Sequence, residues 1–232
     1  MKKLLLFITI ILLGTALKAQ EKSFKKGRII ISVGANLGVY GTKTHEEQDK
    51  SVLLSGAVQT VRKVKDTTGG AGSGVFPLTI EYGITNWLGV GARFGYSKYI
   101  AKADSTNKNT KPTVIGLDGD LVLSLHLIKT VHFDMPLEFV AGYSHLNYMS
   151  NDQNGSSAKS GGLNYGFALV PHIYFGKHIG MFFNLGYSGY SYPNFIYYNN
   201  TSSNLNADSG NLVHKLKGNG VNIGLGLAVK FH

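Results

Sequence analysis

The feature that most constrains this chain is a strict alternation of apolar with small or polar residues, repeated in eight separate segments. One segment alternates Leu88, Val90, Ala92, Phe94 and Tyr96 with Gly89, Gly91, Arg93, Gly95 and Ser97. Successive side chains of a strand point to opposite faces, so each segment predicts a strand with one apolar face and one small or polar face. The eight predicted strands lie at 29–37, 78–84, 88–96, 115–125, 133–143, 163–173, 179–187 and 221–231.

The links between these segments alternate in length. Short links lie near residues 85–87, 127–131 and 176–178, and long polar stretches cover 41–74, 101–112, 149–161 and 193–217. Short turns at one end and long loops at the other are typical of outer-membrane barrels, with the turns in the periplasm. We therefore predict an all-β fold over residues 29–232: a transmembrane antiparallel up-and-down β-barrel of about eight strands.

Composition agrees with a strand-rich membrane protein. The chain has 30 Gly, 13 Tyr and 12 Phe, while charged residues make up only 16%. Such a composition is unusual for a soluble enzyme and is expected where strands bend and an outer face meets lipid. A secreted soluble barrel with an apolar ligand inside is the alternative, since alternation alone does not say which face points inward.

The N-terminus favours export. Lys2 and Lys3 precede an apolar run at residues 4–13, and Ala19 is a small residue suited to cleavage before Gln20. The run is shorter than the roughly 20 residues that an uncleaved membrane anchor needs. We predict a signal peptide at 1–19, followed by a short periplasmic segment at 20–28.

One stretch of the first long loop fits two predictions. Leu54, Ala57, Val58 and Val61 fall at helical spacing, which favours a short amphipathic helix within residues 46–65. The alternative is an extra strand that reaches above the membrane. That alternative gives nine strands, or ten if residues 195–198 also form one.

Two stretches of sequence carry a family resemblance. Residues 77–91 read Pro-Leu-Thr-Ile-Glu-Tyr-Gly-Ile-Thr-Asn-Trp-Leu-Gly-Val-Gly and resemble a hairpin common in the outer-membrane β-barrel domain family. The last segment alternates apolar residues up to Phe231, which is similar to the assembly signal of such barrels, although His232 follows. Nearly all of the mature chain resembles the small eight-stranded barrels, the class of OmpX and the OmpA transmembrane domain. The resemblance implies the outer membrane of a Gram-negative cell, and as partners its lipid and the barrel-assembly machinery.

Most ionisable groups of the predicted strands fall on the polar face, which the barrel turns inward. These groups are Glu81, Arg93, Asp118, Asp120, Asp134, Glu138 and Lys230. An eight-stranded barrel has an interior just wide enough for side chains to fill, so charges inside it must pair. We predict a salt-bridged lumen in which Arg93 and Lys230 neutralise some of the carboxylates. A gated path for protons or ions is the alternative.

Other chemistry has little support in the sequence. Ser124 and His126 share one face of a strand near acidic residues, which would suit a lipid esterase, but such a pair arises easily by chance. The eight His residues show no ligand spacing, and without Cys there is no thiolate site, so we expect no metal and no cofactor. The net charge is +10, but the Lys and Arg residues behind it are scattered through loops. They form no known nucleic-acid-binding motif.

Aromatic residues near the strand ends predict two girdles at the membrane interfaces. The predicted girdle residues are Trp87, Tyr99, Phe133, Tyr148, Phe175, Tyr190 and Phe231. We expect a monomeric, non-enzymatic outer-membrane barrel with a structural role or a surface-binding role through its extracellular loops, whose ligand the sequence does not name. A narrow channel for small solutes is the alternative, and a lipid-modifying enzyme is a third possibility.

Overall fold

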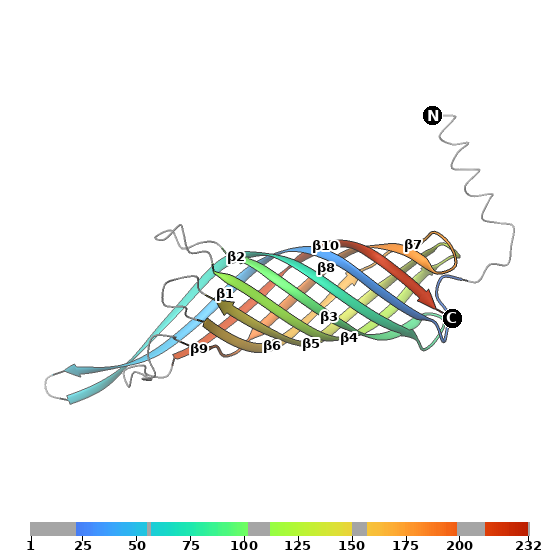
Figure 1. The fold of residues 1–232 in the computed structure, drawn as a ribbon. Helices are drawn as coiled ribbons and strands as arrows, with labels where there is room; N and C mark the ends of the chain where they lie inside the picture. Colours follow the sequence, from blue (N-terminus) through green and yellow to red (C-terminus); the bar gives the residue numbers. More distant parts are fainter. Residues whose placement is uncertain (1–21, 55–56, 102–111, 150–156, 199–211, 232) are drawn as a thin grey trace.

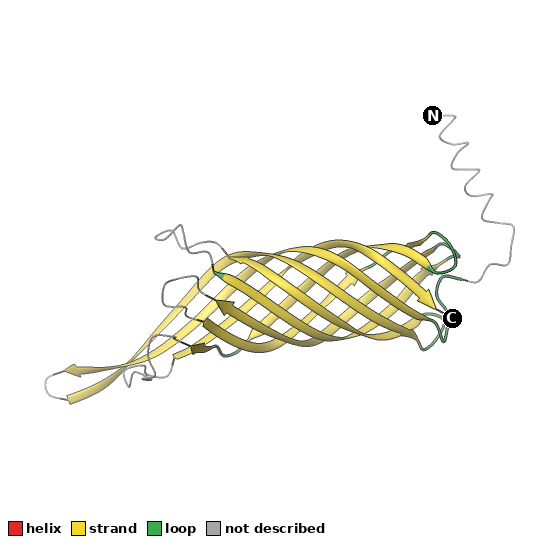
Figure 2. Ribbon diagram, in the orientation of Figure 1, coloured by secondary structure: helices red, strands yellow, loops and turns green. Residues whose placement is uncertain are grey.

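The computed structural model describes residues 22–54, 57–101, 112–149, 157–198 and 212–231 (Figures 1 and 2). This part of the chain is almost entirely extended, and it holds no helix long and apolar enough to cross a membrane. The strands are β1 (Ile29–Leu54), β2 (Ala57–Gly83), β3 (Leu88–Ala101), β4 (Thr113–Lys129), β5 (Phe133–Met149), β6 (Ser157–Leu169), β7 (His172–Tyr174), β8 (Ile179–Tyr192), β9 (Ile196–Tyr198) and β10 (Leu212–Phe231).

The strands close into a barrel. Neighbours pair antiparallel around the ring, and β10 completes it by pairing with β1, from Ile29 opposite Phe231 to Gln48 opposite Leu212. Two barrel strands are interrupted by proline, which lacks the N–H that a ladder requires. Pro171 separates β6 from β7, and Pro193 lies between β8 and β9. The ten elements therefore make eight barrel strands, as the alternation predicted.

The barrel wall has the predicted two faces. Outward residues are apolar and exposed on every strand, with Leu37 69%, Leu121 75% and Leu225 60% accessible. Inward residues are mostly small or polar, and positions such as Asn36, Asp120 and Asn184 are buried. A continuous exposed apolar belt of this kind is stable only where lipid covers it.

The two ends of the barrel differ as expected from the link lengths. Tight turns join β2 to β3, β4 to β5 and β7 to β8 at the end where the C-terminus lies (Figure 1). Backbone hydrogen bonds close each turn, including Ile84 N–H to the Leu88 carbonyl at 2.9 Å and Phe175 N–H to the Ile179 carbonyl at 2.9 Å. We call this the turn end and the opposite one the loop end.

The prediction of a helix within residues 46–65 is wrong. β1 and β2 continue through this segment as one hairpin, paired from Ile29 opposite Tyr82 to Leu54 opposite Ala57, and they project beyond the barrel wall at the loop end (Figure 1). The apolar run was too short to separate a helix from a strand by periodicity. Cross-strand pairing stabilises the arm, because His45 Nδ1 lies 2.5 Å from Asp66 Oδ1 and Arg62 forms an ion pair with Glu47.

The alternative for this segment, a strand that reaches above the membrane, is confirmed, but neither it nor residues 196–198 add a further strand to the barrel wall. The hairpin arm lengthens two existing strands and adds no new one. Residues of β9 pair with β6, from Ser157 opposite Tyr198 to Lys159 opposite Ile196, so β9 extends the barrel strand that β8 begins. The predicted signal peptide at 1–19 lies outside the described residues.

The first prediction tests the lipid belt. Leu121 lies midway along β4 on the outer face, so Leu121→Arg is expected to lower the free energy of unfolding in lipid vesicles by roughly 2–4 kcal/mol. Val64 is similarly exposed, at 52%, but lies on the arm beyond the barrel, so Val64→Arg should change the same quantity by less than about 0.5 kcal/mol. Equal losses in the two variants, measured by denaturant titration, would contradict a membrane belt confined to the barrel wall.

Candidate functional site

The N-terminal segment before β1 folds into the turn end of the barrel. Ser23 and Phe24 are only 0% and 1% exposed, and the Phe24 ring stacks on His126 with ring centroids 3.3 Å apart. The Ser23 N–H donates to the Thr130 carbonyl at 2.7 Å. Gly27, at φ 81°, makes the turn that leads the chain into β1, a backbone conformation that favours glycine. The described part of the segment predicted at 20–28, from residue 22 onwards, therefore helps to close the barrel at its turn end.

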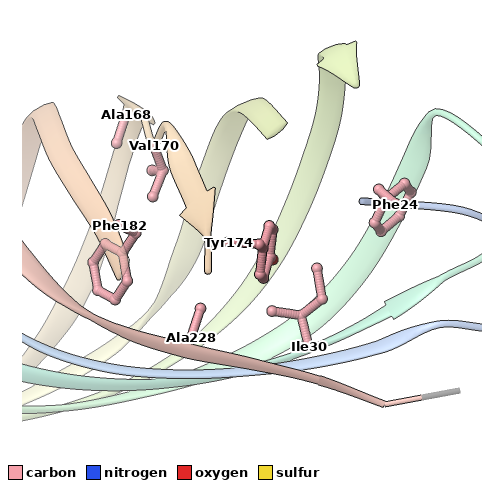
Figure 3. Packing of buried hydrophobic residues seen from close by; sticks show 7 residues of the cluster. All are labelled: Phe24, Ile30, Ala168, Val170, Tyr174, Phe182 and Ala228. Atoms are coloured by element: carbon pink, nitrogen blue, oxygen red, sulfur yellow. The ribbon is translucent and has the colours of Figure 1, made fainter. Parts of the chain in front are cut away.

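An apolar cluster seals the same end. Figure 3 shows its side chains converging inside the barrel from several strands and from the N-terminal segment. The cluster consists of Phe24, Ile30, Ala168, Val170, Tyr174, Phe182 and Ala228, each at most 7% exposed. Burying an aromatic side chain stabilises a fold by roughly 1.5–3 kcal/mol, so the Phe24 ring anchors the segment in place.

A histidine between two carboxylates forms the next layer. His126 Nδ1 lies 2.8 Å from Asp134 Oδ2, and its Nε2 lies 2.7 Å from Glu81 Oε1. All three side chains are almost fully buried. Carboxylate oxygens accept hydrogen bonds, so a ring with both nitrogens so placed donates from both, as an imidazolium does. The three groups therefore neutralise one another in large part.

The predicted lumen charges all lie inside the barrel, with partners that the sequence did not specify. Arg93 forms an ion pair with Glu138, and its Nε donates to Thr79 Oγ1 at 3.0 Å. Asp118 accepts from the hydroxyls of Ser144 at 2.5 Å and Ser97 at 3.1 Å. Asp120 is 9% exposed and faces the same interior.

Lys230 has no carboxylate within salt-bridge distance among the described residues, but Asp134 acts on it electrostatically, so its role in neutralising a carboxylate stays a prediction. Its ammonium lies over the Tyr174 ring, 4.0 Å from the ring centroid, and the residue is 4% exposed. A cation over an aromatic face is attracted by the ring's negative quadrupole. Tyr174 lies on β7, which pairs with β5 and β8, so its ring meets Lys230 of β10 inside the lumen and not across a strand pair.

The residues for an esterase are not assembled. The Ser124 hydroxyl is buried with no hydrogen-bond partner among the described residues, while both His126 nitrogens are bonded to carboxylates. A nucleophile needs a base within hydrogen-bond reach, and His126 offers no free nitrogen. Within the described residues no group of three or more His, Cys, Asp or Glu side chains is placed to hold a metal ion.

Four tyrosines form a separate layer nearer the loop end. Tyr40 packs edge-on against Tyr99 and Tyr190, with ring centroids 6.4 and 5.7 Å apart, and Tyr192 stacks on Tyr190 at 6.2 Å. Edge-to-face contacts are a favourable geometry for aromatic rings. Tyr40 also bonds Ser188 through its hydroxyl at 3.0 Å. We call these four residues the tyrosine layer.

Three of the predicted girdle residues are therefore misplaced. Tyr99, Tyr148 and Tyr190 pack against buried residues inside the barrel. Each lies an even number of residues from the inward-facing positions of its own strand, so the alternating backbone directs its side chain into the lumen. The girdle prediction weighed nearness to a strand end without applying that parity.

The other predicted girdle residues lie at the turn end. Trp87, Phe175 and Phe231 are exposed by 55%, 68% and 45%. Phe133, which begins β5 beside a tight turn, is half-buried. Exposed rings at this level suit the boundary between lipid and water.

The described residues enclose cavities inside the barrel at two levels. A small one of about 70 Å³ lies between the charge network and the tyrosine layer, with Asn36, Asn164 and Asn184 among its lining residues. It is roomy enough for about five water molecules. A larger one of about 460 Å³ lies at the loop end, with the tyrosine layer among its lining residues. We call this larger cavity the cup.

The sequence missed several members of the site. His126 shared the inward parity of Asp118 and Asp120 but was considered only as part of a catalytic pair. Phe24 gave no signal, because nothing in a short N-terminal stretch indicates that it folds back into a barrel. The tyrosine layer could have been found by applying strand parity to Tyr40, Tyr99 and Tyr190.

Comparison with known proteins identifies no family: no family model matches the chain, and no curated protein matches it. Solved structures with a similar fold include the outer membrane protein OprG from Pseudomonas aeruginosa, 17% identical, with a TM-score of 0.48, covering 90% of this chain and 98% of that one. Ail, the attachment invasion locus protein of Yersinia pestis, is 14% identical, with a TM-score of 0.41 and coverage of 89% and 99%. The outer membrane protease OmpT from Escherichia coli is 12% identical, with a TM-score of 0.47 and coverage of 90% and 98%.

The second prediction tests the charge network. Arg93→Met leaves Glu138 buried without its ion-pair partner and is expected to cost about 3–5 kcal/mol of unfolding free energy. The double variant Arg93→Met/Glu138→Gln removes both charges and should recover most of that loss, because an uncharged pair needs no compensation. Denaturant titration of the three proteins in detergent measures both effects. A cost below about 1 kcal/mol for the single variant would show that the lumen charges are solvated instead of paired.

Proposed function

We propose that this protein is a non-enzymatic outer-membrane barrel with a closed lumen, and that it acts through its loop end. The observation that carries the proposal is closure of the lumen at two levels. The apolar cluster and the His126 layer fill the turn end, and the tyrosine layer crosses the barrel towards the loop end. The predicted signal peptide and the exposed apolar belt support the outer membrane as its location.

The interior between the two layers favours a structural role for the lumen and disfavours a channel. Arg93 and Glu138 join β3 to β5 over the inner face of β4, and Asp118 is tied to Ser97 and Ser144 on the neighbouring strands. Buried ionic side chains with fixed partners hold the strands in one arrangement and leave room only for a few waters. A conducting pore needs charges that face a continuous water column.

The loop end is the part that extends furthest from the membrane belt. The arm of β1 and β2 carries exposed charged residues, including Lys63, Lys65 and Asp66, and the cup opens beside it. A surface-binding role would use these two features. As partners we propose outer-membrane lipid around the belt and the barrel-assembly machinery at β10, with the protein acting as a monomer.

The third prediction separates a closed barrel from a channel. Folded wild-type protein in planar bilayers is expected to show no steady open conductance, because two layers block the lumen in series. The variant Phe24→Ala/Tyr99→Ala/Tyr190→Ala removes rings from both layers, and it should conduct only when His126, Arg93 and Glu138, which fill the lumen between them, are also replaced by alanine. Trp87→Ala removes an exposed ring at the turn end and should stay closed. A steady open conductance in the wild type would contradict the proposed function and favour a narrow channel for small solutes.

A further inference from the structure

The cup at the loop end has the size and lining of a small-molecule site. Its volume of about 460 Å³ falls within the roughly 300–1,000 Å³ of typical ligand pockets. Six aromatic side chains line it: Tyr40, Tyr99, Tyr148, Tyr190, Tyr192 and Phe195. They come from five different strands or links, so closure of the barrel is what brings them together.

The aromatic floor is already organised without a ligand. Tyr99 and Tyr190 meet edge-on with ring centroids 6.2 Å apart, and Phe195 lies 6.3 Å from Tyr192. Beneath the rings, the Tyr192 hydroxyl bonds Ser144 at 2.7 Å, which fixes it to the polar interior. A preformed aromatic pocket binds more tightly because little side-chain freedom is lost on binding.

The wall of the cup carries no formal charge. Val114, Leu146 and Leu216 supply aliphatic surface, and among the described lining residues none is Asp, Glu, Lys or Arg. His214 stands on the rim beyond the membrane belt, where burial lowers its pKa despite nearby Glu46, so its ring is neutral at neutral pH. A charged ligand would therefore lose its hydration without gaining an ionic partner.

We propose that the cup is a binding site for an uncharged aromatic molecule of about two to three rings, entering from the loop end. Ring faces and edges of the tyrosine layer receive the ligand's rings by stacked and edge-on contacts. Thr42 and Thr44 at the wall, with the tyrosine hydroxyls, supply a few hydrogen-bonding groups of the kind that orient a mainly apolar ligand. This assignment rests on the proposed function, since it names the ligand class for a barrel that acts at its loop end.

A matched pair of fluorescent probes tests the ligand class. N-phenyl-1-naphthylamine is uncharged, and 8-anilino-1-naphthalenesulfonate has the same rings with an added sulfonate. Titrated into nanodiscs that carry the folded barrel, the uncharged probe is expected to show a saturable signal above that of empty nanodiscs. The sulfonated probe should bind at least tenfold more weakly. Equal saturable affinity for the two probes, or no saturable signal for the uncharged one, would overturn the proposal.

Two variants of one strand locate the site. Leu216→Glu places a carboxylate in the cup wall and should raise the apparent Kd of the uncharged probe at least tenfold. Lys217→Glu, exposed on the opposite face of β10, makes a larger change in net charge and should leave the Kd within about twofold of the wild type. Heat-modifiable electrophoretic mobility checks that each variant is folded. Unchanged binding in folded Leu216→Glu would show that the probe binds elsewhere.

Conductance of the same purified protein in planar bilayers separates the two proposals. A closed wild-type barrel that fails to bind the uncharged probe removes the cup assignment and leaves the closed-barrel function standing. A conducting wild-type barrel removes the proposed function whatever the probes do. Displacement of the probe by tetramethylammonium would overturn the ligand class, because it would assign the aromatic rings to a cation.

Discussion

The structure depends on closure of the hydrogen-bonded ladder between β10 and β1. In lipid, a backbone N–H or C=O without a partner costs several kcal/mol, and a sheet with a free edge has a whole row of them. The pairing from Ile29 opposite Phe231 to Gln48 opposite Leu212 removes that edge. Once the ring is closed, alternation fixes the direction of each side chain in the barrel wall. One set of alternate residues faces lipid, and the other set faces the lumen.

Closure also decides the chemistry of the interior. Charged side chains on separate strands are brought within a few ångströms of one another in a space that water scarcely fills, so each is stable only with a partner. Arg93 finds Glu138, while His126 lies between Glu81 and Asp134. Lys230 has an aromatic face beneath its ammonium in addition to the electrostatic attraction of Asp134. The resulting contacts are structural in character, and they block the path that a channel would need.

The same geometry divides the barrel into functional levels. Apolar packing around Phe24 closes the turn end, a polar network occupies the middle, and the tyrosine layer separates that network from the cup. Because the charged middle lies beneath an uncharged cup, the cup favours an uncharged ligand. The aromatic rings keep the two environments apart, since they present hydroxyls to Ser144 and Ser188 and ring surface to the cup.

The sequence alone determined the eight strands, their two faces and the turn end. Lipid on one side of the wall imposes a two-residue period of apolar side chains, which is visible in the chain itself. Alternation also placed Glu81, Arg93, Asp118, Asp120, Glu138 and Lys230 on the polar face, and the prediction of a membrane barrel turned that face inward. The sequence could not assign partners, because a partner depends on how strands distant in sequence are registered around the ring. The helix prediction for 46–65 failed for a related reason: the pairing of β1 with β2 overrides a short local pattern. Only the tertiary structure decided that Phe24 folds into the lumen and that tyrosines from separate strands meet, since both follow from closing the barrel and have no local signature in the chain.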